Sequence, residues 1–517
     1  FSRCIAAIWQ QCQSSARVAA AGGLFAASVN FINFGKLYAT IHRYTGQSVV
    51  VTALLSLAYA LLCQLKIAAF FFLHRFLLRV NEFTLINALA LSAATALCDA
   101  ALPELFPWSW GNALAAQPFL RQWASVGTVY LLSFIAAFGG ITLAAVFFAA
   151  APLRLRLQAV QYHAAALLLA LLIGFALYLW PAAPGRTVSA LAVQTNIGAA
   201  PEARRSDSDF AADAINRLFN QSLEGLILHG RANLILWGEA SMPFHSSDGD
   251  AESRDIYSPT FDAVPEYLHR ISGAAILYQD LHRQKNRLHA RLLVRPAPAI
   301  DLSAYLKRRL VPWGEYLPFE GALPAMRAWF PEAGRLSPGN TGNEISARFA
   351  GMPAFRADRQ RLKDDLTLMS APEKIRAAYP LPQNSGQIIV KPLLCYEALF
   401  PSDSRVEAAE LIVNLASDAW FGDGIEGEQH AAAVALRAVE NGVPMLRAAM
   451  SGVSFMVDAR GEDLTPRSGQ GRPAILHADI PLTTRKTVFA RFGMAAFYAL
   501  MAAALWPYAL ERAISRR

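Results

Sequence analysis

The chain has 517 residues, of which 54% are hydrophobic, and its formal net charge is +8 at pH 7. A mean hydropathy of +0.28 is too high for an ordinary soluble enzyme, so part of the chain must lie in lipid. The Lys and Arg residues form no run with interleaved aromatic residues, which argues against nucleic-acid binding. The apolar residues are unevenly distributed and predict a membrane, globular, membrane order along the chain.

Apolar stretches of about 20 residues are long enough to cross a bilayer. They predict membrane spans at 18–35, 49–73, 83–98, 124–150, 160–180 and 488–510. Residues 1–12 resemble the end of another span, and because the sequence opens on Phe1 we expect a further N-terminal piece. The expected organisation is a helical membrane domain, a globular domain, a C-terminal span and a basic tail, over 1–180, 186–485, 488–510 and 511–517.

Basic residues in short loops mark the cytoplasmic side of a membrane protein. Here they are Arg75, Arg79, Arg154, Arg156, Arg512, Arg516 and Arg517. Alternation of the spans then places both the 99–123 connection and the globular region outside. Charged residues inside spans would indicate a transporter, but only Lys66 and His74 lie there, and we expect Lys66 to extend toward the interface.

The globular region alternates buried strands with amphipathic helices, which predicts a layered α/β fold. The expected helices cover 206–228 and 429–441. The expected strands lie at 187–197, 232–239, 273–280, 287–295, 387–395, 410–417, 442–450, 452–461 and 473–482. Residues 320–386 show weak periodicity and are expected to form a loop excursion with short helices.

The cysteines do not form a disulfide framework. Cys4, Cys12, Cys63 and Cys98 lie in or beside apolar spans, where cysteine is typically a small packing residue. Cys395 stands alone in the globular region, directly after the apolar stretch "IIVKPLL". An unpaired thiol outside the cytoplasm is a candidate reactive group.

Three polar residues end apolar strands: Glu239 in "LILWGEASMP", Lys307 in "YLKRRLVPWGEYLP" and Cys395 in "LLCYEALFP". Strand ends are where sites assemble in α/β sheets. A thiolate can act as nucleophile, a carboxylate can take its proton, and an ammonium can stabilise an oxyanion. Each residue alone fits a solvated turn, surface charge or inert core. Of the histidines, His430 is the one to test, although a capping or surface role is favoured.

The order and surroundings of these residues resemble the nitrilase, or carbon–nitrogen hydrolase, superfamily. With flanking spans, the chain resembles the apolipoprotein N-acyltransferase family in particular. The matching segments include "KRRLVPWGEYLP", "CYEALFP", "LIVNLASDAWFG" and, in the membrane part, "FPWSWGN". The resemblance covers most of the chain and implies a polytopic α-helical membrane domain plus an α/β nitrilase-like domain, an αββα sandwich.

The resemblance also implies residue roles. Cys395 is the acyl-accepting nucleophile, Glu239 the general base and Lys307 the stabiliser of the transition state. Glu315, Tyr396 and Glu397 match supporting positions of the family. No cofactor and no metal are implied.

The implied reaction removes an acyl chain from a membrane phospholipid and holds it as a cysteine thioester. The implied phospholipid is phosphatidylethanolamine. The acceptor is the free α-amine of the diacylglyceryl-cysteine of an apolipoprotein, and the acyl transfer completes lipoprotein maturation. The resemblance implies a monomer in the bacterial inner membrane with its catalytic domain on the periplasmic side. Loops at 244–250, 329–336 and 419–424 are candidates for contact with lipid.

Some positions depart from the family pattern. The segment "GAAPEARRSD" lacks the tryptophan that usually follows the first strand, Ser417 stands where Asn is usual, and Met450 and Ser451 replace Asn and a small polar residue. Two alternatives stay open: a membrane-tethered amidase that uses water as acceptor, and a catalytically inactive binding protein. A transporter whose external domain receives cargo belongs with the second alternative and ranks low.

Overall fold

The computed structural model describes residues 28, 38–39, 42, 48–63, 65–77, 84–148, 153–180, 185–197, 208–241, 258–295, 304–330, 333–340, 342–350, 372–383, 385–422, 424–483 and 485–515. The chain divides into two compact units. The first comprises residues 1–181, 439–441 and 486–517, and the second comprises residues 182–438 and 442–485.

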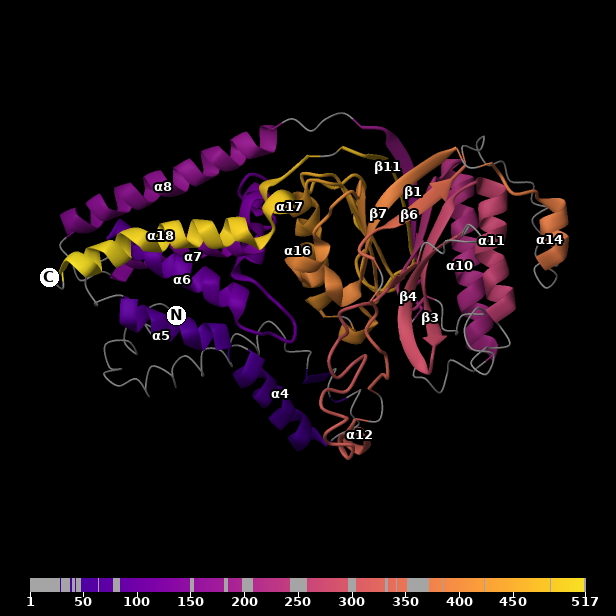
Figure 1. The fold of residues 1–517 in the computed structure, drawn as a ribbon, viewed down its shortest axis with the longest axis horizontal. Helices are drawn as coiled ribbons and strands as arrows, with labels where there is room; N and C mark the ends of the chain where they lie inside the picture. The colour runs from indigo at the N-terminus through magenta and orange to yellow at the C-terminus, as the bar shows by residue number, and fades with distance from the viewer. Residues whose placement is uncertain are drawn as a thin grey trace. The chain divides into compact units, whose positions relative to one another are not determined.

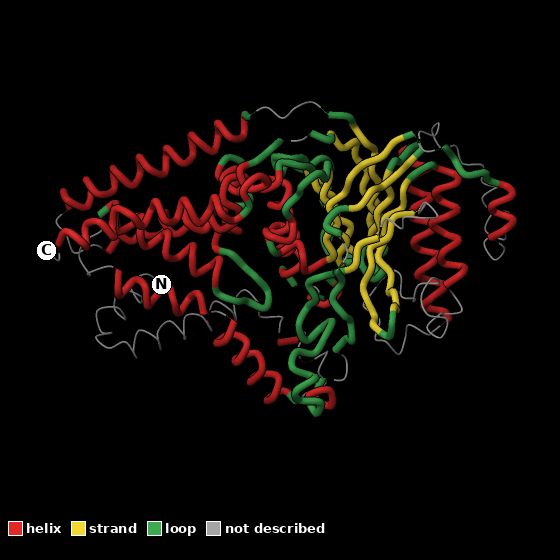
Figure 2. Tube along the Cα trace, in the orientation of Figure 1, coloured by secondary structure: helices red, strands yellow, loops and turns green. Residues whose placement is uncertain are grey.

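The described part of the first unit is helical (Figure 2). Its α-helices are α4 (Val49–Cys63), α5 (Leu65–Leu77), α6 (Leu85–Ala101), α7 (Ala124–Phe148), α8 (Leu153–Leu179), α17 (Val488–Phe492) and α18 (Met494–Ser515). Two short 3-10 helices, η1 (Trp110–Leu114) and η2 (Leu120–Trp123), precede α7. Helices α6, α7 and α18 share an apolar cluster that contains Ala93, Leu131 and Phe497.

Within the described residues, three helical segments are long and apolar enough to cross a membrane: Leu120–Leu143, Val160–Leu179 and Met494–Ser515. They lie where the sequence predicts spans at 124–150, 160–180 and 488–510. The last predicted span is interrupted by Gly493, whose φ of 59° separates α17 from α18. Val49–Tyr59 and Leu85–Ala101 are shorter apolar helices. The predicted span at 18–35 falls almost entirely outside the described residues.

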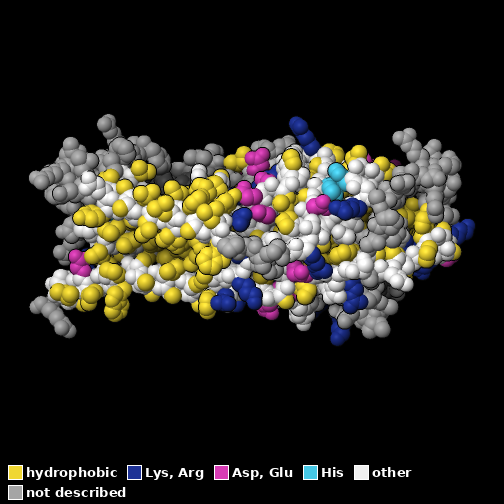
Figure 3. Space-filling view, turned by 90° about the horizontal axis from the view of Figure 1, so that it is seen from above, with side chains coloured by type: hydrophobic (Ala, Val, Ile, Leu, Met, Phe, Trp, Pro, Cys, Tyr) yellow, Lys and Arg dark blue, Asp and Glu magenta, His cyan; other side chains and the backbone are white. Residues whose placement is uncertain are grey.

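Helices α8 and α18 expose large apolar side chains, and Figure 3 shows apolar side chains gathered over the left part of the view. Leu168, Leu172 and Leu179 of α8 are each more than half exposed, as is Trp506 of α18. A soluble protein rarely leaves such a continuous apolar surface in water. The exposed faces therefore fit contact with lipid tails.

Lys66 corrects one expectation, because it does not extend toward an interface. It is only 2% exposed, and its ammonium lies 3.1 Å from Asp99 and 2.9 Å from Glu104. The Asp99 carboxylate also accepts a 2.6 Å hydrogen bond from the Ser133 hydroxyl. Lys66 is therefore part of a buried ionic cluster that joins α5, α6 and α7 to the loop before η1.

The second unit contains two β-sheets (Figure 1). One has the strand order β11-β1-β2-β3-β4-β5 and the other has the order β10-β9-β8-β7-β6. The strands of the first sheet are β1 (Thr187–Gln194), β2 (Leu234–Trp237), β3 (Ala275–Gln284), β4 (Arg287–Arg295), β5 (Ala304–Leu306) and β11 (Ala474–Pro481). Those of the second are β6 (Ile345–Phe349), β7 (Gly386–Leu394), β8 (Leu411–Ala416), β9 (Met445–Ala449) and β10 (Phe455–Val457).

Each sheet has a parallel centre: β1, β2 and β3 run parallel, as do β7, β8 and β9, and antiparallel strands flank them. The parallel strands read as continuous apolar runs because both of their faces are buried. One face of each sheet meets the other sheet in a shared core, which includes Leu236, Val390 and Leu446.

Helices cover the outer faces of the sheets. Helices α10 (Ser208–His229) and α11 (Ser258–Ser272) pack on the first sheet through a cluster that includes Leu218, Trp237 and Tyr267. Figure 1 shows α16 (Glu426–Asn441) on the side of the second sheet away from α10 and α11. The layer order is helix, sheet, sheet, helix, so the predicted αββα sandwich is confirmed.

The 320–386 excursion contains one strand that was not expected, besides the short helices that were. It contains β6, which pairs with β7, and the short helices α12 (Met326–Trp329) and α14 (Pro372–Ala378). Residues 351–371, the middle of the excursion, lie outside the described residues.

Candidate active site

Glu239, Lys307 and Cys395 meet because each follows a strand of the sandwich. Glu239 follows β2, Lys307 follows β5 directly, and Cys395 follows β7 directly. The two sheets are joined beside them, since the Ala416 carbonyl at the end of β8 accepts hydrogen bonds from the N–H groups of Glu239, at 3.2 Å, and Met450, at 2.9 Å. The carboxyl ends of the parallel strands therefore form one edge of the sandwich, where the sequence predicts a site.

Lys307 is the centre of a buried ionic cluster. Its side chain is fully buried, and its ammonium lies 2.9 Å from Glu239 Oε1 and 2.5 Å from Glu315 Oε1. The second oxygen of Glu315 accepts a 2.8 Å hydrogen bond from the Val311 N–H. Two carboxylates thus share one cation, which holds both at a fixed distance from the strand ends.

Glu397 connects the turn that carries Cys395 to the end of β5. One of its oxygens accepts hydrogen bonds from the Tyr305 hydroxyl, at 2.7 Å, and from the N–H groups of Arg308 and Arg309, at 2.7 and 3.1 Å. Its other oxygen accepts the Leu394 N–H at 2.8 Å. Glu397 is 1% exposed, so it is an internal brace and not a solvated turn residue.

Cys395 is held in an unusual backbone conformation. Its φ of 44° lies in the left-handed region, which non-glycine residues adopt at a cost on the order of 1 kcal/mol or more. It starts the 3-10 helix η4 (Cys395–Leu399) directly after β7, so the chain turns sharply at the thiol. The thiol is half-buried, and a hydrogen bond from it helps to lower the pKa of Glu239.

Burial and charge set the protonation of the three groups. Burial, followed by the Glu239 charge, raises the pKa of the Cys395 thiol well above its usual range. Burial and then Glu315 raise the pKa of Glu239, and Lys307 opposes them. Burial alone would lower the pKa of Lys307, but the charges of Glu239 and Glu315 outweigh it and raise that pKa. The resting site thus holds a protonated thiol beside a carboxylate of increased basicity.

The structure also shows the contacts of Tyr396, Ser417 and Met450, which the sequence analysis singled out. Tyr396 is 5% exposed, and its ring meets Phe400 edge to face at 5.0 Å. Ser417 presents its backbone carbonyl to the Cys395 thiol, at 3.9 Å, so a serine supplies that contact as well as an asparagine would. Met450 is buried against Ile197.

The sequence interpretation missed a polar group beside the thiol. Asp418 lies two residues beyond β8 at the same edge of the sandwich, and Arg447 lies in the middle of β9. His430 was expected to be a cap or a surface residue, which is wrong: it is 7% exposed and its ring contacts Asp418 at 2.8 Å. The sequence carries two signals for this group: Asp418 closely follows a buried strand, and an arginine inside an apolar strand requires a buried partner.

The αββα sandwich, with a thiol, a carboxylate and an ammonium together at its strand ends, is the architecture of an enzyme of the nitrilase fold. The family model for carbon–nitrogen hydrolases matches residues 226–488, and the chain belongs to this family. A second model, the apolipoprotein N-acyltransferase N-terminal domain, matches residues 3–142.

Curated relatives match over long stretches. Apolipoprotein N-acyltransferase 1 of Leptospira interrogans is 27% identical over 509 residues, which cover 90% of this chain and 83% of the relative. Apolipoprotein N-acyltransferase of Caulobacter vibrioides is 30% identical and covers 52% of this chain and 45% of its own. A crystal structure of Saccharomyces cerevisiae Nit3, a member of branch 10 of the nitrilase superfamily, has a TM-score of 0.35 and 14% identity over 58% of this chain and 91% of its own.

Proposed function

We propose that this protein is an apolipoprotein N-acyltransferase that works through a thioester on Cys395. One observation carries the proposal. The chain has Glu239, Lys307 and Cys395 together at one site, and its N-terminal region matches the model of the acyltransferase N-terminal domain. The apolipoprotein N-acyltransferase 1 of Leptospira interrogans, which matches 90% of this chain, supports the same activity.

The first half-reaction loads the acyl chain. Glu239 takes the thiol proton of Cys395, and the thiolate sulfur attacks the ester carbonyl of a phospholipid. Lys307 stabilises the oxyanion of the tetrahedral intermediate. The ester C–O bond then breaks, and the leaving lysophospholipid alkoxide receives the proton that Glu239 holds. We propose phosphatidylethanolamine as the acyl donor.

The second half-reaction transfers the chain to an amine. The free α-amine of a diacylglyceryl-cysteine attacks the thioester carbonyl and gives a proton to Glu239. The C–S bond breaks, an amide is formed, and the proton returns to the Cys395 sulfur. Because a thioester reacts readily with amines, one site can serve two lipid-anchored substrates in turn.

The proposed architecture follows from the substrates. Residues 1–180 and 488–510 anchor the protein in the bacterial inner membrane, residues 186–485 form the catalytic domain on the periplasmic side, and residues 511–517 are a cytoplasmic tail. The exposed apolar side chains of α8 and α18 support anchoring in lipid. We propose a monomer, since all the acid, base and nucleophilic groups come from one chain.

Intact-mass measurement of the full-length protein in detergent micelles with phosphatidylethanolamine tests this function. We expect the protein mass to rise by one acyl group, and we expect no rise in the Cys395→Ala variant. Cys98→Ala, which removes another free cysteine, is the matched control and should still be acylated. An adduct that survives Cys395→Ala would refute the proposal.

Addition of a diacylglyceryl peptide with a free amine separates the transferase from an amidase. The transferase returns an N-acylated peptide and the unmodified enzyme mass. An enzyme that uses water as its acceptor releases free fatty acid and leaves the peptide unchanged.

A further inference from the structure

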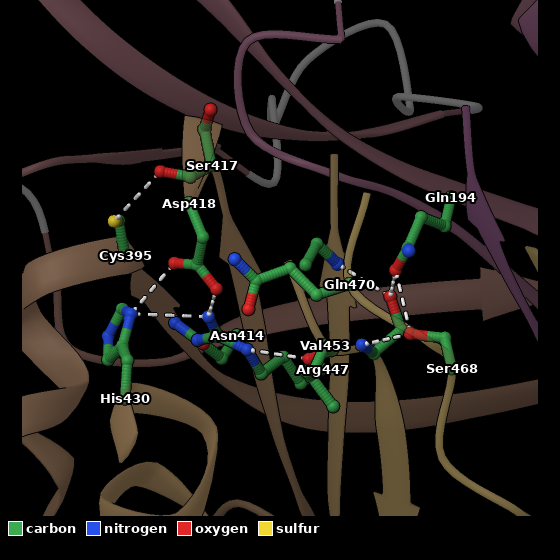
Figure 4. A network of polar contacts seen from close by, with 12 residues as sticks. Gln194, Cys395, Asn414, Ser417, Asp418, His430, Arg447, Val453, Ser468 and Gln470 are labelled. Atoms are coloured by element: carbon green, nitrogen blue, oxygen red, sulfur yellow. Dashed lines mark hydrogen bonds and ion pairs between the residues drawn. The ribbon is translucent and has the colours of Figure 1, made fainter. Parts of the chain in front are cut away.

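A second buried polar group adjoins Cys395 and takes no part in the acid, base and nucleophile chemistry (Figure 4). It consists of Asp418 after β8, His430 on α16 and Arg447 on β9, which we call the Asp–His–Arg network. The Cys395 sulfur, the Asp418 carboxylate and a ring nitrogen of His430 lie within 4.8 Å of one another. The network therefore lies at the nucleophile itself.

The Asp418 carboxylate is held from both of its oxygens. Its Oδ1 lies 2.8 Å from His430 Nδ1, and its Oδ2 accepts a 2.7 Å hydrogen bond from Arg447. Arg447 also donates to the Asn414 side chain and, at 3.1 Å, to the Val453 carbonyl. Desolvating such charges is expensive, and a buried ion pair is often no more stabilising than an apolar replacement. Its position beside a reactive thiol suggests a role other than stability.

The three ligand-type atoms at Cys395 do not make a good metal site. The Arg447 guanidinium is 2.7 Å from the Asp418 carboxylate and 3.2 Å from His430 Nδ1, so it already occupies the place of a cation. A divalent ion between these groups would meet that fixed positive charge. Burial alone would raise the pKa of Asp418, but Arg447 and His430 outweigh it and hold that pKa well below its usual range.

The network reaches the nucleophile at two points. The thiol contacts the Ser417 carbonyl at 3.9 Å, and Ser417 directly precedes Asp418, so a fixed Asp418 side chain restrains that carbonyl. A ring nitrogen of His430 also lies within 4.8 Å of the Cys395 sulfur, on the residue whose left-handed φ must be maintained. A residue in such a conformation needs surrounding contacts to stay there.

We propose that Asp418, His430 and Arg447 are positioning residues of the acyl transfer. They fix the backbone of Cys395 and the Ser417 carbonyl so that the thiol stays in line with Glu239. The inference rests on the proposed function only in taking Cys395 as the nucleophile. The charged groups that act on this thiol are Glu239, Lys307, Asp418 and Arg447.

Gly452 offers a way to disturb the network without changing its charge. A methyl group at Gly452 would lie 1.9 Å from Asp418 Oδ2, so Gly452→Ala must displace the carboxylate. Gly342→Ala is the matched control, because an added methyl group there meets no atom within 4 Å. His430→Gln complements it by replacing the ring while keeping a neutral polar side chain.

The test measures alkylation of Cys395 by iodoacetamide in the full-length, lipid-free protein, as a function of pH, by peptide mass. We expect Gly452→Ala and His430→Gln to slow both alkylation and acylation of Cys395 by about 10- to 100-fold and to shift the pH profile of alkylation. Gly342→Ala should match the wild type. Unchanged alkylation rates and pH profiles in folded variants would overturn the proposal, even if their melting temperature falls.

A double variant and the lipid-free assay cover two further outcomes: a variant that does not fold, and a wild type that forms no acyl adduct. If a single variant does not fold, the double variant Asp418→Asn, Arg447→Met removes both buried charges together, and the same slowing is expected. Alkylation needs no lipid, so it tests the network even if the wild type forms no acyl adduct, an outcome that would count against the proposed function alone.

Discussion

The Tyr305 hydroxyl donates a 2.7 Å hydrogen bond to the Glu397 carboxylate, which ties strand β5 to the turn that begins with Cys395. The same carboxylate oxygen accepts the N–H groups of Arg308 and Arg309. The distance between Lys307 and Cys395 therefore depends on Glu397. Its hydrogen bonds reach neither the Lys307 ammonium nor the Cys395 thiol.

Glu397→Gln should show this dependence. The variant turns an amide N–H₂ toward backbone N–H donors, so at least one buried donor loses its acceptor. We expect apparent stability to fall by about 1–3 kcal/mol and acylation of Cys395 to fall at least tenfold. Tyr305→Phe removes a single donor and should be milder in both. A Glu397→Gln variant that acylates at the wild-type rate would contradict the bracing role.

Lys307→Met tests the ionic cluster through pH. Without the cation, the pKa of Glu239 should rise further, because Lys307 lowers it now. A carboxyl whose pKa is higher in the folded state stabilises the fold below the unfolded value, about 4.3, and loses that contribution as the pH rises through the folded value. The melting temperature of the variant should therefore fall between pH 5 and pH 8 relative to the wild type. A constant difference across that range would contradict this account.

Gly238→Ala tests how closely the sheets approach at the site. A methyl group at Gly238 would lie 2.5 Å from the Met450 nitrogen and 2.7 Å from the Ala449 carbonyl carbon, both of which are backbone atoms that cannot swing aside. The displacement should fall on Glu239, the next residue, so we expect the acylation rate to drop at least tenfold. Gly342→Ala, which has open space, is the control.

The buried cluster in the helical unit gives a prediction about stability alone. Lys66→Met leaves Asp99 and Glu104 without a cation and should cost about 3–5 kcal/mol, seen as a lower melting temperature in detergent. Burial raises the pKa of Glu104 to about 7, so this carboxyl needs its charge less. Glu104→Gln should accordingly be much milder than Lys66→Met, and equal losses would contradict the ionic account.

Much of this fold could be predicted from local pattern. Strands such as β2 and β8 are apolar runs bounded by turn residues, and α10 has a clear helical period. The layer order and the strand-end positions of Glu239, Lys307 and Cys395 follow from that alternation. Helix α11 did not emerge from the pattern because Pro265 lies inside it, a residue that usually ends a helix.

The rest of the site depends on tertiary pairing that no single segment encodes. His430 lies on a helix whose sequence also fits a solvent-facing surface, and only its contact with Asp418 shows its place. Lys66 likewise has no partner nearby in sequence, since Asp99 is 33 residues away. Local sequence can indicate that a buried charge needs a partner, but not which residue supplies it.

The left-handed backbone conformation of Cys395 lowers the stability of the domain. Glycine adopts that conformation freely, so Cys395→Gly is expected to relieve about 1 kcal/mol of backbone strain. On backbone strain alone, glycine would therefore be the more favourable residue at position 395, where we propose the nucleophile. A cysteine in this strained conformation is what we expect if position 395 is kept for chemistry, so the residue found there in a related sequence should indicate whether that protein still works as an enzyme.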